Sequence, residues 1–147
     1  MTSPELERLE ERGFLHREPP GRAELEGLIA TARARLSDAQ REELAEESRF
    51  DLAYNAAHAL ALAALRWHGF RAEKRYLVFQ ALPHTLGSPV ATWRLLAKCH
   101  EERNQTEYQG FWRVDEKLLA GLIAAARELL AGVQALDLPP APEDRRR

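Results

Sequence analysis

Apolar residues recur at intervals of three and four along most of the chain, and this spacing limits the fold more than any other feature. In an α-helix, residues at this spacing line one face, which has to be buried against a neighbour. Such stripes lie within residues 22–36, 52–67 and 118–133, and a shorter one begins after Ser88-Pro89. The sequence therefore predicts an all-α fold of four or five antiparallel helices around one core.

Proline, glycine and short polar residues mark the expected ends of these helices. Ser3-Pro4 predicts the start of an additional short helix at the N-terminus, because serine caps helices and proline fits the first helical position. Gly69 predicts the end of the helix that begins at Ser48. Pro83 predicts an end or a kink in a short helix over 72–82, since proline has no N–H to donate.

We expect three parts in the chain, and we find no alternation of apolar and polar residues that would predict a strand. Residues 1–21 are predicted to form the N-terminal helix and a linker from His16 to Gly21, and residues 22–136 the bundle. Residues 137–147 are rich in proline and charge, which predicts a disordered tail.

Composition excludes several classes of function. Lys and Arg number 21 against 23 Asp and Glu, so the net charge of -2 gives no global basic field for nucleic acid. One cysteine, Cys99, forms no internal disulfide and no cysteine-based zinc site. The five histidines lack metal-ligand spacing, and we expect neither a metal nor a cofactor. The absence of an apolar run of about 18 residues and of a signal segment predicts a cytoplasmic protein that does not enter the membrane.

A dense polar stretch, Ala97–Gly110, interrupts the apolar pattern inside a predicted helix. Arg103 could hold a phosphate through its bidentate fork, Asn104 could orient a ligand, and Tyr108 could donate a hydrogen bond. Asn104 and Tyr108 are four residues apart and share one helix face. The alternative is a solvated face with weak ion pairs. We take Arg103, Asn104 and Tyr108 as the candidate catalytic residues.

Three further residues complete the candidate ligand-binding set with Arg103 and Asn104. Tyr54 and His58 lie four apart on the alanine-rich helix and could face the same cleft as Arg103, or could cap the edge of the core. His100 lies one helical turn before Asn104 and could act as a base or serve the structure alone.

Three segments, taken in order, resemble the HEPN family: residues 48–60, residues 75–87 and the R-N-x-x-x-Y motif at 103–108. The resemblance covers about residues 22–136. It implies an up-down antiparallel four-helix bundle that usually dimerises. Many members are metal-independent ribonucleases with an R-x4-6-H motif, often toxins paired with a nucleotidyltransferase, whereas others bind nucleotides or proteins without catalysis.

In this chain Arg103 matches the motif arginine and Asn104 the polar residue after it, whereas Tyr108 stands where the family has histidine. The ordinary tyrosine pKa of about 10 makes a poor proton shuttle at neutral pH. We therefore expect a non-catalytic HEPN-like homodimer that binds a nucleotide, RNA or a partner protein through the Arg103 region. The alternatives are a metal-independent ribonuclease toxin and a structural dimeric partner of a small nucleotidyltransferase.

Overall fold

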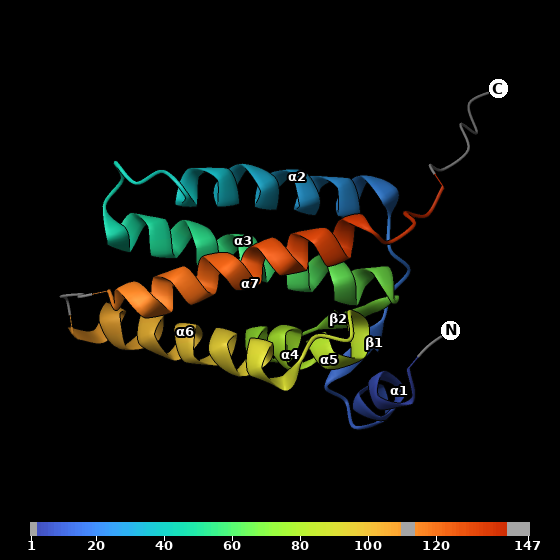
Figure 1. Cartoon of the computed structure of the whole chain (residues 1–147). Helices are drawn as coiled ribbons and strands as arrows, with labels where there is room; N and C mark the ends of the chain where they lie inside the picture. The colour runs from blue at the N-terminus through green and yellow to red at the C-terminus, as the bar shows by residue number, and fades with distance from the viewer. Residues whose placement is uncertain (1–2, 110–113, 141–147) are drawn as a thin grey trace.

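The structure, a computed structural model, describes residues 3–109 and 114–140, and for residues 106–109 it describes the backbone alone. The described residues are mostly helical, which confirms the predicted all-α class (Figure 1). The elements in chain order are α1 (Pro4–Glu11), β1 (Leu15–Arg17), α2 (Arg22–Ala39), α3 (Glu46–Trp67), β2 (Phe70–Ala72), α4 (Arg75–Gln80), α5 (Leu82–Thr85), α6 (Val90–Gln109) and α7 (Glu116–Gln134).

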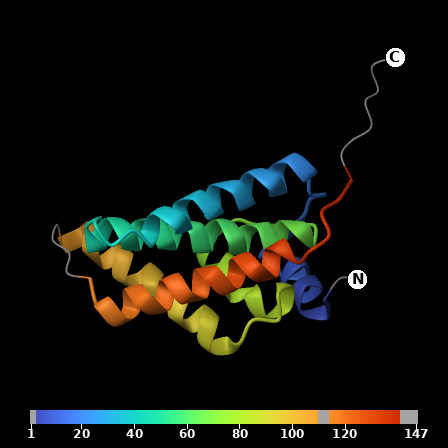
Figure 2. The same ribbon diagram turned by 45° about the horizontal axis from the view of Figure 1, so that its top comes forward.

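Helix α3 is the centre of the fold. It packs against α2, α4, α5, α6 and α7, and Figure 2 shows it between α2 and α7. Much of its buried face is alanine, and small side chains let the neighbouring helices approach closely. The four long helices α2, α3, α6 and α7 run in alternating directions along the chain (Figure 1). No helix of the described residues is long and apolar enough to cross a membrane.

Several helix ends lie where the sequence predicts them. The Asp115 side chain caps α7 by accepting a hydrogen bond of 2.9 Å from the Lys117 backbone N–H. Gly69 follows α3 with a φ of 86°, a conformation that glycine adopts without strain. The helix predicted over 72–82 is divided into α4 and α5, with Pro83 in the first turn of α5, because proline cannot continue the hydrogen bonds of α4.

The prediction that no strand is present was wrong. β1 falls partly in the predicted linker and pairs antiparallel with β2, Leu15 opposite Ala72 and Arg17 opposite Phe70. Leu15 and Phe70 are buried in the core. Strands of three residues are too short for an alternating pattern to be visible in the sequence.

Arg66, near the end of α3, ties the predicted linker to the bundle. Its side chain is buried and its Nε and Nη2 atoms donate to the Glu24 carboxylate at 2.8 and 3.1 Å. The guanidinium also donates to the carbonyl oxygens of Glu18, Pro19 and Phe70, at 2.8, 3.1 and 3.2 Å. One cation therefore satisfies backbone acceptors in two segments that are far apart in the sequence.

The start of the predicted tail, residues 137–140, is held against the bundle. Trp67 Nε1 donates to the Asp137 carbonyl at 2.7 Å, and Arg22 Nη1 donates to the Pro139 carbonyl at 3.2 Å. Leu138 packs against the core. The remainder of the predicted tail, 141–147, lies outside the described residues.

Candidate functional site

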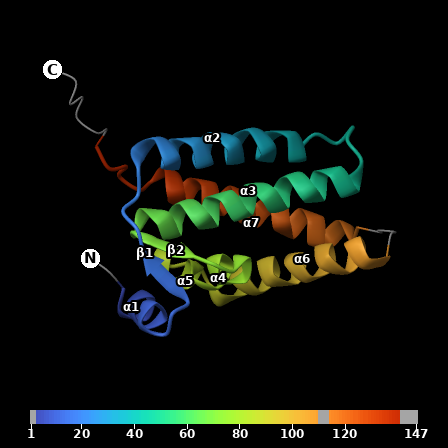
Figure 3. The same cartoon turned by 180° about the vertical axis from the view of Figure 1, so that it is seen from behind.

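Four of the predicted residues lie together where α6 packs against α3. Tyr54 comes from α3, and His100, Arg103 and Asn104 come from α6. Asp51, one turn before Tyr54 on α3, completes the group through its contact with Arg103. We call these five residues the Arg103 cluster. Figure 3 shows the side of the molecule on which α3 lies above α4 and α6.

Tyr54 and Asn104 occupy the two ring nitrogens of His100. Tyr54 Oη lies 2.6 Å from His100 Nδ1, and Asn104 Nδ2 lies 3.2 Å from Nε2. With the amide in this orientation, Asn104 donates to Nε2, so Nδ1 carries the proton and donates to the tyrosine oxygen. With the Asn104 amide rotated by about 180°, its oxygen accepts from Nε2–H, and Nδ1 accepts from the Tyr54 hydroxyl. In either arrangement both ring nitrogens of the neutral imidazole are engaged by these two neighbours.

Arg103 is held between an aromatic ring and a carboxylate. Its Cζ lies 4.9 Å from the centroid of the Tyr54 ring, and its Nε lies 3.3 Å from Asp51 Oδ1. The contact with Asp51 is an ion pair without hydrogen-bond geometry, since Oδ1 has no hydrogen-bond partner among the described residues. About a quarter of the Arg103 side chain, 26%, is exposed. The guanidinium is thus positioned and can still contact an anion from solvent.

A second arginine adds to the positive field at this site. Burial raises the pKa of Tyr54, while the charges of Arg103 and Arg75 oppose that shift. The tyrosine is therefore a neutral hydroxyl at physiological pH. Arg75, the first residue of α4, is exposed and has no ion-pair partner in the part of the chain that the structure describes.

His58 lies one turn after Tyr54 and is not hydrogen-bonded to the Arg103 cluster. Its ring meets the Phe79 ring edge-on at 5.6 Å, and its buried Nε2 has no hydrogen-bond partner within residues 3–109 and 114–140. Burial, and then the charges of Arg75, His100 and Arg103, lower the pKa of His58 to about 4. His58 is therefore neutral at physiological pH.

The low pKa of His58 predicts a specific loss of stability in acid. The unfolded chain takes up this proton near pH 6.5, whereas the folded chain resists it down to about pH 4. Stability should therefore fall by about 1.4 kcal/mol per pH unit through this window and level off below it. Denaturant unfolding of wild type and His58→Leu at a series of pH values measures the effect. Parallel stability curves for the two proteins would contradict the assignment.

Tyr108, the third candidate catalytic residue, has its side chain outside the described part of the structure. Its backbone lies in the last turn of α6, five residues after Arg103. The structure accordingly places Arg103 with Asn104, His100 and Tyr54, and does not describe the relation of Tyr108 to them.

Two residues that contact the candidate residues in this region were not themselves among the candidates. Asp51 pairs with Arg103, and Phe79 packs edge-on against Tyr54 at a ring separation of 5.8 Å. Asp51 lies three residues before Tyr54, a helical spacing that could have marked it as a neighbour. No spacing in the sequence relates Phe79 to α3, because only the packing of α4 brings them together.

Other chemistries receive little support. No group of three His, Cys, Asp or Glu side chains among the described residues is placed to hold a metal ion. Cys99 is fully buried, and burial raises the pKa of its thiol to about 12, so it is not a ready nucleophile.

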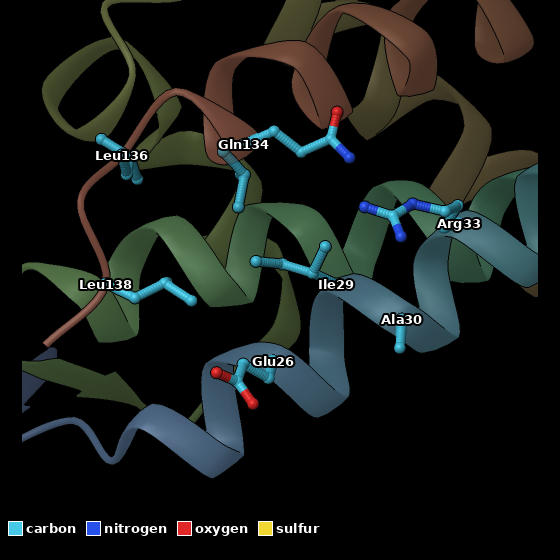
Figure 4. A pocket seen from close by; sticks show the side chains of 8 residues that line it. Glu26, Ile29, Ala30, Arg33, Gln134, Leu136 and Leu138 are labelled. Carbon is cyan, nitrogen blue, oxygen red and sulfur yellow. The ribbon is translucent and has the colours of Figure 1, made fainter. Parts of the chain in front are cut away.

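A separate cavity of about 330 Å³ lies between α2 and the end of α7. Figure 4 shows Glu26, Ile29 and Arg33 of α2 facing Leu136 and Leu138 across it. Of the predicted site residues whose side chains the structure describes, none lines this cavity.

Comparisons with family models, with curated proteins and with solved structures found no match for this chain. The Arg103 cluster is therefore interpreted from its own geometry.

Proposed function

We propose that this chain is a non-catalytic HEPN-like module that binds a nucleotide or RNA through a phosphate held by the Arg103 cluster. The observation that carries the proposal is the position of Arg103. Its guanidinium is held by the Tyr54 ring and Asp51, and it is partly open to solvent. A positioned guanidinium is the usual protein group for bidentate phosphate recognition.

Neighbouring groups fit an anionic ligand. Asn104 is exposed beside Arg103, and Arg75 contributes a second positive charge to the field at Tyr54. The net charge of the chain is -2, so attraction for a phosphate would have to be local, as this pair of arginines provides.

The alternating directions of α2, α3, α6 and α7 support the HEPN-like part of the proposal (Figure 1). From the same resemblance we propose a homodimer. We favour binding over catalysis because both ring nitrogens of His100 are engaged and Tyr54 keeps its proton. A metal-independent ribonuclease is the second candidate, because a histidine does lie beside the motif arginine.

Binding of a fluorescent single-stranded RNA, followed by anisotropy in EDTA, tests the proposal. We expect Arg103→Gln to weaken binding at least about tenfold, because a charged hydrogen bond to phosphate is lost. The matched control is Arg94→Gln, an exposed arginine on the same helix, which should bind within about twofold of wild type. Unlabelled AMP and inorganic phosphate are then added as competitors of the bound RNA. Displacement by AMP shows that a nucleotide is enough for binding, and displacement by inorganic phosphate shows that the phosphate alone is enough.

Equal binding by wild type and Arg103→Gln, or no binding of any of the three ligands, would exclude the proposed role. Gel analysis of the same samples follows the fate of the RNA. Intact RNA is the expected result. Cleavage by wild type that Arg103→Gln abolishes would favour the ribonuclease instead.

A further inference from the structure

A groove of about 520 Å³ runs along α3 between α2 and the start of α4. Figure 3 shows α3 between α2 and α4, the three helices whose residues line this groove. Its volume is in the range of small-molecule sites, which is about 300–1,000 Å³. Arg35 of α2, Asn55 and His58 of α3, and Arg75 of α4 are among the residues that line it.

The groove carries a net positive charge. Arg35 and Arg75 have no ion-pair partner in the described segments, so both charges are available to a ligand. Glu24 is the one carboxylate among the described lining residues, and Arg66 neutralises it through two hydrogen bonds. His58 adds no charge at neutral pH, because burial lowers its pKa to about 4. The net charge of the groove is therefore positive, and Arg35 and Arg75 supply it.

The remaining walls are mostly apolar. Leu28 of α2 and Ala59 and Leu62 of α3 also line the groove. Gly27 lies on the α2 wall, and a Cβ built there meets nothing within 4 Å. An apolar surface beside two guanidinium groups fits an anion with an apolar body, since such a ligand removes apolar surface from water and pairs with a fixed cation.

We infer that this groove binds a small organic phosphate with an apolar body, through Arg35 and Arg75. Arg75 also adds to the positive field at Tyr54, whereas Arg35 belongs to the groove alone, and the groove can bind this ligand without Arg103.

Calorimetric titration with phenyl phosphate tests the inference, with inorganic phosphate as the probe for the charge alone. We expect phenyl phosphate to bind more tightly than inorganic phosphate. Arg35→Gln and Arg75→Gln should each weaken it about tenfold. Arg33→Gln is the matched control, because Arg33 is on the same helix but lines the cavity of Figure 4. Arg33→Gln and Arg103→Gln should both leave the affinity within about threefold of wild type.

Gly27→Leu gives a second test that does not remove charge. The leucine side chain should fill open space on the groove wall, and the helix should tolerate it, because glycine is a poor helix former. We expect an unchanged or higher melting temperature and the loss of phenyl phosphate binding, whereas Gly27→Ala should still bind. Binding unchanged in Gly27→Leu and in both arginine variants, or no binding to wild type, would overturn the inference.

Discussion

Replacing Arg66 by alanine should lower the free energy of unfolding by about 2–4 kcal/mol, a large effect for a charged residue. The substitution leaves Glu24 without its partner and three backbone carbonyls without a donor. The Phe70 carbonyl is buried and stays desolvated when its charged donor is removed, whereas the Glu24 carboxylate, whose side chain is 40% exposed, can be rehydrated. Equilibrium unfolding in urea, monitored by circular dichroism, measures the change.

Arg71→Ala is the matched control for this prediction. Arg71 is exposed and makes one long ion pair, 3.8 Å from Nε to the Glu18 carboxylate. Arg71→Ala should lower the free energy of unfolding by less than about 1 kcal/mol. Arg66→Lys keeps the charge but not the planar fork, so it should remain clearly destabilised. If Arg66→Ala is no more destabilised than Arg71→Ala, Arg66 does not hold the linker to α3.

Truncating Tyr54 to alanine should destabilise the protein by about 3–5 kcal/mol. The side chain is fully buried, packs against Phe79, and supports both Arg103 and His100. Tyr54→Phe keeps the ring and removes only the hydroxyl, so it should cost about 1–1.5 kcal/mol through the lost hydrogen bond to His100. The same urea unfolding experiment separates the two contributions.

Tyr76→Ala is the matched control, since Tyr76 is 46% exposed and should cost much less. Two outcomes would contradict the packing of Tyr54 described for the Arg103 cluster. The first is a Tyr54→Ala variant as stable as Tyr76→Ala. The second is a Tyr54→Phe variant as unstable as Tyr54→Ala, since the ring would then contribute nothing.

The long helices α2, α3 and α7 were predictable because each carries an apolar stripe at helical spacing. The seam of α7 and its cap at Asp115 are local features, and local features are visible in a sequence. The β1–β2 pair was not predictable in the same way. It depends on a register between segments more than fifty residues apart and on a buried arginine that donates to the carbonyls of Phe70 in β2 and of Glu18, the residue after β1.

Part of the candidate site could also be predicted from helical spacing. His100 and Asn104 are four apart on α6 and do meet, as do Asp51 and Asn55 on α3, where the amide donates to the Asp51 carbonyl at 2.9 Å. The approach of Arg103 to Tyr54 and of Arg75 to His58 depends on how α4 and α6 dock on α3. Spacing within one helix carries no information on that docking.

The central claim is that Arg103 itself contacts a phosphate. The most direct measurement is the nitrogen–proton NMR signal of the Arg103 Nε–H, assigned by its absence from the spectrum of Arg103→Gln, during titration with single-stranded RNA. We predict that this signal moves saturably, with the same Kd that anisotropy gives. A signal that stays in place while RNA binds elsewhere on the protein would contradict the claim.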